Sequence, residues 1–206
     1  MKLSRLRRVL EESVPGFPSP RRELEQYRTP PEAALEAVSL LPAGCRLVVD
    51  LGAGTGMIAY AASLSRGWYV VAVDVDDAAV EAARGSSLYP VSLVDFVVAD
   101  ASRLPLRSGA PGLCVAQNPP FGVVRRGADR LFVEAASRLG AAVVVSMHLF
   151  SRRAEVFLRR LYGRLGYRVD YMAVLRFPIP QLYPRHAKRI HYASVVLVLA
   201  RRVEQP

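Results

Sequence analysis

The stretch RLVVDLGAGTG, residues 46–56, joins a short apolar run that ends in an acid to a turn rich in glycine. Residues from Met57 to about Ser65 follow with the spacing of a helix. Glycines in such a strand–turn–helix unit let the backbone approach a ligand at the helix N-terminus. Dinucleotide sites and P-loops also use glycines, so the spacing alone does not identify the ligand. The turn lacks a Gly-Lys-Ser/Thr ending, and a P-loop site is therefore not supported.

Apolar runs and helical segments alternate downstream of this turn. This alternation predicts an α/β fold with a mostly parallel sheet covered by helices on both faces. The last two runs have no clear helix between them, which predicts an edge hairpin with one antiparallel strand. The seven expected strands are residues 46–51, 69–74, 94–100, 113–117, 141–147, 168–175 and 192–200, and the expected helices are residues 32–41, 57–65, 77–84, 130–139 and 151–165.

A chain of 206 residues that is 51% hydrophobic can fill one core, so we expect one domain with an extension. Four residues among positions 15–20, three of them prolines, break a basic helical start and mark residues 1–31 as the extension; Thr29 is a candidate N-cap for the next helix. The apolar runs fall short of the ~20 residues that a membrane span requires. No secretory signal is visible, and we expect a cytoplasmic protein.

The rare residue types carry further information. Cys45 and Cys114 each lie inside an apolar run, so we expect no disulfide framework and a reducing compartment. Two cysteines and three scattered histidines leave no metal-ligand spacing. Thermolabile residue types are scarce, which is typical of thermophile proteins. The single asparagine, Asn118, and the only threonines, Thr29 and Thr55, fall inside the motifs described below.

Charge is distributed unevenly along the chain. Residues 31–100 carry three basic and nine acidic groups, net −6, whereas residues 150–206 carry twelve and three, net +9. A polyanion such as nucleic acid is the natural partner of the basic C-terminal quarter. The alternative is a solvated, arginine-rich surface without a ligand.

Three acids stand at the ends of successive strands: Asp50, Asp74 and Asp100. An acid after the second strand suits the two hydroxyls of a ribose. An acid after the third strand can accept from the exocyclic amine of an adenine. Asp50 beside the glycine turn favours a ligand that carries positive charge and no phosphate. The alternative is that these acids only cap helices and loops.

The combination resembles motif one of the class I methyltransferases, which have a Rossmann-like fold and bind S-adenosylmethionine. The resemblance implies that Asp74 holds the ribose and that Asp100 lies near the adenine. It also implies a set of residues around the methionine and sugar portions, namely Gly52, Gly54, Thr55, Gly56 and Met57.

The segment Asn118-Pro119-Pro120-Phe121 follows the fourth expected strand, at the sheet edge where ligands bind. Two prolines stiffen the loop and remove two N–H donors. The loop therefore presents acceptors, the Asn118 side-chain oxygen and the Pro119 carbonyl, which suit an amino group with two hydrogens. If the methyl group is already activated, its transfer requires little more than the correct positioning of that nitrogen. Phe121 offers a ring on which a planar base can stack.

This segment resembles the catalytic motif of amino-methyltransferases that modify adenine, guanine or glutamine, and Phe121 favours a nucleobase. Three further segments, residues 24–31, 145–148 and 182–188, resemble the methyltransferase-like enzymes that methylate adenine N6 in small-subunit ribosomal RNA. The resemblance implies a cofactor lid within residues 1–31 and a methyltransferase domain over residues 32–206. It assigns Gln26, Tyr27 and Thr29 to the cofactor and four residues to RNA: His148, Tyr183, His186 and Lys188. Arg185 and Arg189 flank His186 and Lys188, and their charge favours phosphate contacts there.

Relatives of this kind often work with a small zinc-binding activator subunit that adds a strand to the sheet, and the resemblance implies such a partner here. Other readings stay open at this point. The chain could methylate guanine N2, DNA adenine or protein glutamine. It could also be an inactive cofactor-binding factor in ribosome assembly that uses only its basic surface.

Overall fold

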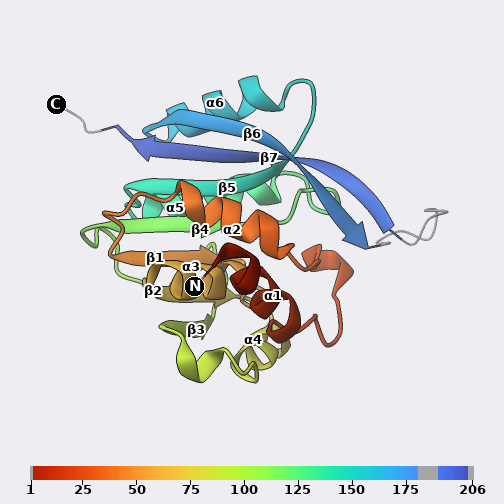
Figure 1. Ribbon diagram of the computed structural model, residues 1–206. Helices are drawn as coiled ribbons and strands as arrows, with labels where there is room; N and C mark the ends of the chain where they lie inside the picture. The colour runs from red at the N-terminus through yellow and green to blue at the C-terminus, as the bar shows by residue number, and fades with distance from the viewer. Residues whose placement is uncertain (1, 181–189, 204–206) are drawn as a thin grey trace.

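Seven strands form one sheet in the order β3-β2-β1-β4-β5-β7-β6 (Figure 1). This computed structural model describes residues 2–180 and 190–203. All neighbouring strands are parallel except for β7, which is antiparallel to both β5 and β6. The strands are β1 (Leu47–Leu51), β2 (Tyr69–Asp74), β3 (Val94–Val98), β4 (Leu113–Gln117), β5 (Val143–Leu149), β6 (Tyr167–Pro180) and β7 (Ile190–Arg202).

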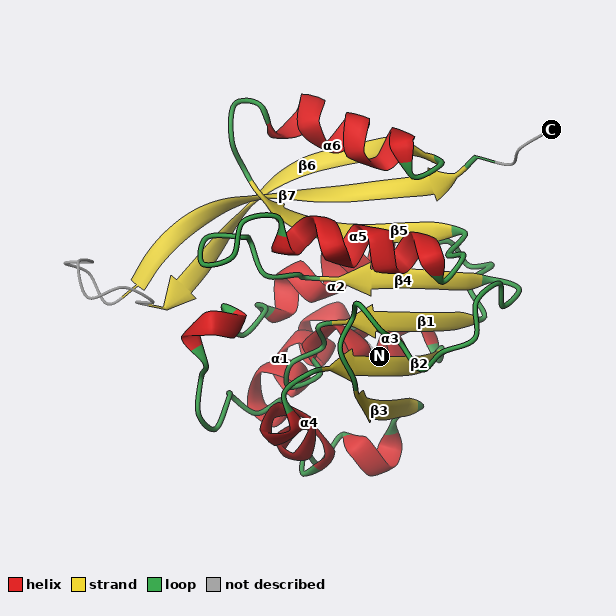
Figure 2. Ribbon diagram, turned by 180° about the vertical axis from the view of Figure 1, so that it is seen from behind, coloured by secondary structure: helices red, strands yellow, loops and turns green. Residues whose placement is uncertain are grey.

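Helices cover both faces of the sheet (Figures 1 and 2). One face packs against α1, α2, α3 and α4, and the other packs against α5 and α6. The expected α/β fold is confirmed. The helices are α1 (Leu3–Ser13), α2 (Pro31–Leu40), α3 (Met57–Arg66), α4 (Asp77–Arg84), α5 (Ala128–Arg138) and α6 (Ala154–Arg164), with short 3-10 turns η1 (Arg22–Leu24) and η2 (Tyr89–Val91).

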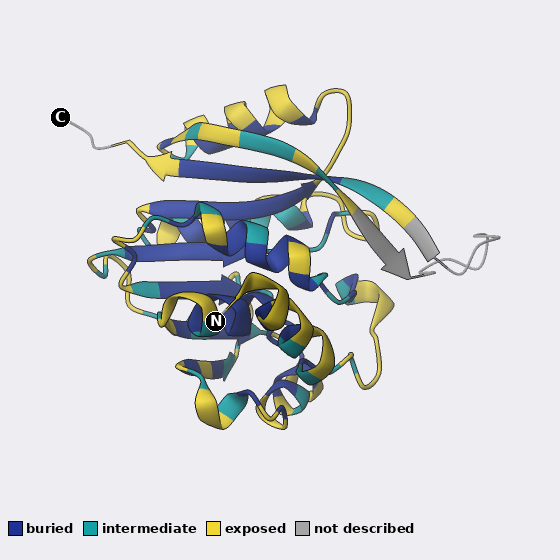
Figure 3. Cartoon of the chain, in the orientation of Figure 1, coloured by how far each residue is buried: buried dark blue, intermediate teal, exposed yellow. Residues whose placement is uncertain are grey.

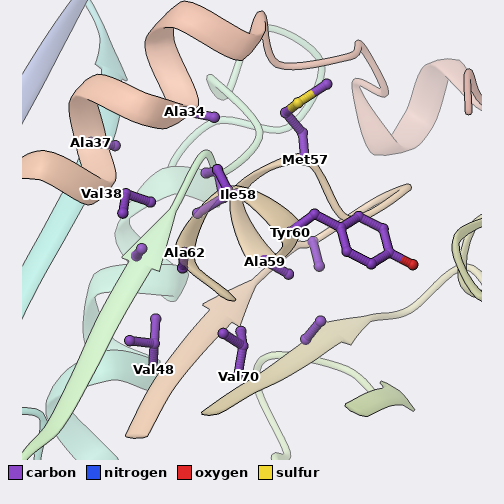
Figure 4. Packing of buried hydrophobic residues seen from close by; sticks show 14 of the residues in the cluster. Ala34, Ala37, Val38, Val48, Met57, Ile58, Ala59, Tyr60, Ala62 and Val70 are labelled. Atoms are coloured by element: carbon purple, nitrogen blue, oxygen red, sulfur yellow. The ribbon is translucent and has the colours of Figure 1, made fainter. Parts of the chain in front are cut away.

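Figure 3 shows that the central strands are buried, and the buried residues on both sides of them are mainly aliphatic. Ala34 and Ala37 of α2 face Ile58 and Ala62 of α3, and these small residues let the two helices pack closely (Figure 4). Leu6 and Leu10 of α1 belong to the same cluster. The basic N-terminal helix therefore shares the core of the sheet domain. Within the described residues, no helix is long and apolar enough to cross a membrane.

The expected edge hairpin with one antiparallel strand is confirmed, since β6 and β7 pair antiparallel at one edge of the sheet. Within this hairpin β7 lies next to β5, so the last strand is internal and β6 forms the edge. The N-terminal end of α2 differs from the expectation, because Pro30 occupies the N-cap position and no side chain caps the helix. Thr29 was the candidate cap, but its hydroxyl accepts a hydrogen bond from Asn118 instead.

The expectation of no disulfide framework is wrong, because Cys45 and Cys114 form a disulfide with Cα atoms 5.8 Å apart. The Arg46 N–H donates to the Gly112 carbonyl at 2.9 Å, so the segment before β1 lies beside the start of β4. Both cysteines are buried at that point. The two residues are 69 positions apart, and only the pairing of β1 with β4 brings them together.

Candidate active site

The chain reverses its direction across the sheet between β1 and β4. From β1 it proceeds to β2 and β3, and it then returns to β4 and β5 on the other side. The loops after β1 and β4 therefore flank a crevice at the carboxyl ends of the parallel strands, where open α/β sheets bind ligands. The glycine turn and the Asn118 segment are these two loops.

The glycine turn is tied to the end of the neighbouring strand. The Gly54 N–H donates to Asp74 Oδ2 at 2.6 Å, and the Gly52 N–H donates to the Val73 carbonyl at 2.8 Å. Gly54 has φ +53°, and a β-carbon there would come within 2.7 Å of the Phe17 ring. Only glycine permits both this backbone conformation and this close contact.

Asp50 lies beneath the turn rather than at its surface. Its Oδ2 accepts from the Ala59 N–H of α3 at 2.9 Å, and the side chain is buried. Burial raises the pKa of Asp50 to about 8, so the carboxyl group is protonated at neutral pH. Its Oδ1 has no hydrogen-bond partner in the described structure. Since Oδ2 accepts from the Ala59 N–H, the proton of the neutral carboxyl group lies on Oδ1, which is a buried donor without a partner among the described residues.

A cavity of about 220 Å³ lies between the two loops and the N-terminal segment. Asp74 and Asp100 are on its wall. Hydrogen bonds from the backbone and hydroxyl of Ser102 hold the pKa of Asp100 below its usual value, so this acid stays ionised. Eight of the expected site residues line the cavity: Gln26, Tyr27, Gly52, Gly54, Asp74, Asp100, Asn118 and Pro120.

Seven other expected site residues do not line this cavity. Thr55 turns its hydroxyl away and donates to the Pro15 carbonyl at 2.7 Å. Met57 is buried in the core. The contributions assigned to all these residues stay predictions. The residues outside the lining are Thr29, Asp50, Thr55, Gly56, Met57, Pro119 and Phe121.

The N-terminal segment closes over the glycine turn. Gln26 Nε2 donates to Asp76 Oδ2 at 2.6 Å, and Gln26 Oε1 accepts from the Arg21 N–H at 2.7 Å. On the substrate side, Glu25 Oε1 accepts from the Val124 N–H at 2.7 Å. The segment is therefore fastened both to the end of β2 and to the loop after Phe121.

The two expected acceptor oxygens point to a common position. Asn118 Nδ2 donates to the Thr29 hydroxyl at 2.9 Å, which directs Asn118 Oδ1 the other way. The Tyr27 hydroxyl lies 3.5 Å from Asn118 Oδ1 and 3.5 Å from the Pro119 carbonyl oxygen. Burial, followed by the Glu25 carboxylate, raises the pKa of Tyr27 well above its usual value, so this hydroxyl keeps its proton as a donor. One donor group thus reaches both oxygens.

Aromatic rings complete the site. The Tyr27 ring lies 5.0 Å from the Phe121 ring at an interplanar angle of 35°. Phe17 and Phe132 pack against Gly54 and Gly52 of the turn. Sequence reasoning missed Phe17 and Phe132, because a phenylalanine in a proline-rich segment or on a helix carries no specific signal. Arg125, which also lines the cavity, could have been suspected from its place after the Asn118 motif.

His148 does not lie on the surface, contrary to the expectation that it faces RNA. It is 1% exposed. Its Nδ1 lies 3.3 Å from Asp129 Oδ2, and its Nε2 lies 3.3 Å from the Tyr162 hydroxyl. It fastens α5 and α6 to the end of β5. The other residues expected to contact RNA lie outside the described residues: Tyr183, Arg185, His186, Lys188 and Arg189. The described residues contain no group of three or more metal-ligating side chains.

Several of the known proteins that this chain resembles are methyltransferases. Residues 48–142 match a methyltransferase domain family. The chain is 33% identical to the rRNA N(6)-adenosine-methyltransferase Mettl5 of Drosophila melanogaster, over 92% of this chain and 91% of that protein. It is 28% identical to METTL5 of Danio rerio, over 92% and 93% of the two chains. A crystal structure of a candidate RNA methyltransferase from Pyrococcus horikoshii has a TM-score of 0.85 at 31% identity and covers 99% of both chains.

Proposed function

Because this chain belongs to the methyltransferase family of the rRNA N(6)-adenosine-methyltransferases, we propose that it methylates the N6 amino group of an adenine in ribosomal RNA of the small subunit, with S-adenosylmethionine as the donor. The family relationship supports the reaction type. The site geometry supports an exocyclic amine as the acceptor. We infer that the enzyme acts in the cytoplasm, since its substrate belongs to the ribosome.

The observation that carries the proposal is the convergence of Asn118 Oδ1 and the Pro119 carbonyl on one point. The Tyr27 hydroxyl lies 3.5 Å from each oxygen, so a single donor group can reach both. An amino group placed there would give one hydrogen to each acceptor, and its lone pair would face the cavity. The side chain of Thr29 fixes which end of the Asn118 amide is presented. Phe121 lies beside this point through its contact with Tyr27.

The residues that line the cavity fit S-adenosylmethionine. Asp74 and Asp100 line the cavity beside the backbone of Gly52 and Gly54, which supports their proposed contacts with the ribose hydroxyls and the adenine amine. When bound, the cofactor supplies an activated methyl group on a sulfonium. The protein then needs to align the amine and exclude water rather than provide a dedicated base.

Transfer to RNA is tested by supplying the purified protein with tritiated S-adenosylmethionine and four acceptors: small-subunit RNA, total RNA, DNA and a release-factor protein. We expect label in small-subunit RNA, both as the purified acceptor and within total RNA, and N6-methyladenosine after digestion to nucleosides. Label in N2-methylguanosine, DNA or glutamine would contradict the adenine proposal. A protein that binds the cofactor but labels none of the acceptors would instead favour the inactive assembly factor.

We also propose that a small zinc-binding activator subunit adds a strand at β3. In the described sheet, β3 pairs only with β2 and forms a free edge. Apolar side chains next to this edge are exposed, with Leu93 at 51% and Val98 at 50%. Free strand edges that expose apolar residues are suited to strand addition. We expect Val98→Asp to prevent copurification with such a subunit, whereas Val156→Asp on α6 should not; equal binding by both variants would contradict this.

A further inference from the structure

A groove runs between α5 and α6 on the face opposite the N-terminal helix, with a volume of about 520 Å³. Its walls are rich in guanidinium groups and contain one acid, Glu134. No metal-ligating or catalytic residue of the proposed active site lines it. The side chains that matter for its chemistry are Arg130, Arg152, Arg153, Phe157, Arg160 and Arg164.

The wall formed by α6 is a single stripe. Arg153, Phe157, Arg160 and Arg164 are spaced by four, three and four residues, which places them on one side of an α-helix. At 1.5 Å per residue, the stripe is about 16 Å long. It alternates positive charges with one aromatic ring, and Phe157 is 51% exposed. A nucleic acid strand offers the complementary pattern of phosphates and base faces.

Most of these charges are not neutralised by the protein. Arg130 pairs with Glu134 across 2.6 Å. Among the described residues, no acid lies within ion-pair distance of Arg153, Arg160 or Arg164. Arg159 is different, because it turns to the other side of α6 and pairs with Glu155 at 3.1 Å. The groove thus holds a surplus of positive charge that favours a polyanion.

The groove begins at the carboxyl ends of the parallel strands, where the active site also lies. Both α5 and α6 start at the carboxyl ends of strands β4 and β5 (Figure 2). Arg125, in the loop just before α5, lines the catalytic cavity. A second hollow, which reaches Asp129 and His148, shares Arg153 and Phe157 with the groove. A nucleic acid strand that leaves the active site past Arg125 can therefore continue along α6.

We propose that the groove between α5 and α6 binds the phosphate backbone of the RNA strand that carries the target adenine. This inference rests on the proposed function and extends it to a second contact surface. Arg153, Arg160 and Arg164 contact phosphates, and Phe157 stacks on a base or ribose of the same strand. Phosphate contacts position RNA without reading its sequence, so the groove contributes affinity while the Asn118 loop selects the amine.

Two neighbouring arginines of α6 provide a matched test. Arg160→Gln and Arg159→Gln remove the same charge from the same helix, but only Arg160 lines the groove. Binding of a small-subunit RNA fragment is measured by fluorescence anisotropy between 50 and 200 mM salt, with the Arg160→Gln/Arg164→Gln double variant alongside. Cofactor affinity of each variant serves as the control for folding.

We expect the double variant to bind RNA at least tenfold more weakly and to lose about 1.5 from the slope of log K against log salt, since each phosphate contact contributes roughly 0.7–0.9. Arg159→Gln should stay within about twofold of the wild type. Single-turnover methyl transfer at saturating RNA should be unchanged in Arg159→Gln.

Equal RNA affinity in the double variant and in Arg159→Gln would overturn the groove proposal and would make an acidic protein the ligand to seek. The two proposals fail separately. A wild-type protein that transfers no methyl to adenine contradicts the proposed function, whereas the salt dependence tests the groove in either case.

Discussion

Among single residues, Asn118, Pro119 and Tyr27 define the proposed position of the substrate amine. Thr29 orients the Asn118 amide, the two prolines keep the carbonyl of Pro119 in place, and the Tyr27 hydroxyl stands between the two acceptors. A hydroxyl in this position occupies the place proposed for the amino group of adenine. The target base must therefore displace the Tyr27 hydroxyl before its own amine can be held.

Tyr27→Phe removes this competing donor and keeps the ring. Contacts of 3.5 Å are weak hydrogen bonds, so their loss is worth at most about 1 kcal/mol. We expect the KM for RNA to fall up to about fivefold, with kcat within about twofold of the wild type. Steady-state methyl transfer measures both quantities. A loss of kcat greater than a hundredfold would show instead that the hydroxyl takes part in the transfer.

Asp50 predicts how stability depends on pH. Its folded pKa of about 8 lies above the unfolded value near 4, so the folded state holds the proton more tightly. The contribution of Asp50 to the free energy of unfolding is therefore greatest below pH 4 and falls as the pH rises through 8. Without cofactor, the free energy of unfolding measured by urea denaturation should be lower at pH 8.5 than at pH 5 by more than about 1 kcal/mol. Asp50→Asn should make this difference smaller. The same decrease in the variant would contradict this role.

At the level of structural elements, the N-terminal segment is the part of the site least visible in the sequence. Prolines and a short basic helix mark a break, yet the structure places Phe17 against Gly54 and the Pro15 carbonyl against Thr55. The resemblance supplied Gln26 and Thr29 as site residues. No local pattern shows that Phe17, nine residues before Gln26, covers the glycine turn.

Phe17→Ala should loosen the cover of the glycine turn without changing the acceptor loop. We expect the Kd for S-adenosylmethionine, measured by calorimetry, to rise about five- to tenfold, and kcat at saturating cofactor to stay within about twofold. Leu3→Ala on α1, whose side chain is 68% exposed, is the control and should leave Kd unchanged. Equal affinities of the two variants would exclude Phe17 from the cofactor site.

The local sequence pattern predicts which residues form strands and helices better than it predicts which strands pair with each other. Alternating apolar runs and helical spacing predict the elements from 46–51 to 192–200, and the structure contains all of them. The insertion of β7 between β5 and β6 depends on long-range pairing, which the periodicity of a single strand does not encode. For the same reason, burial of His148 beside Asp129 and Tyr162 could not be predicted from its place at a strand end.

On the scale of the complete protein, the acidic and the basic parts of the chain form different surfaces. The acidic part, residues 31–100, supplies Asp50, Asp74 and Asp100 around the cofactor cavity. The basic part supplies the arginines of α6. The sequence therefore predicts the two ligand classes, while the structure adds where the basic surface meets the catalytic edge.

The disulfide is the main feature of the complete protein that sequence reasoning excluded. Intracellular proteins of hyperthermophiles are an exception to the rarity of intracellular disulfides, so the bond and a thermophile-like composition are compatible. It closes a segment of 69 residues across β1 and β4. Reduction should lower the free energy of unfolding by about 2–4 kcal/mol. Chemical denaturation with and without dithiothreitol measures this, and Cys45→Ala/Cys114→Ala should show no response; an equal response would contradict the stabilising role.

The acceptor function of Asn118 is tested most directly by Asn118→Ala. Tritiated methyl transfer to small-subunit RNA and calorimetric binding of S-adenosylmethionine are measured on the same preparation. We expect transfer to fall at least a thousandfold, because one of the two oxygens that align the amine is lost, while the Kd for the cofactor changes less than about threefold. A variant that retains full transfer would contradict the proposal that Asn118 and Pro119 hold the adenine amine.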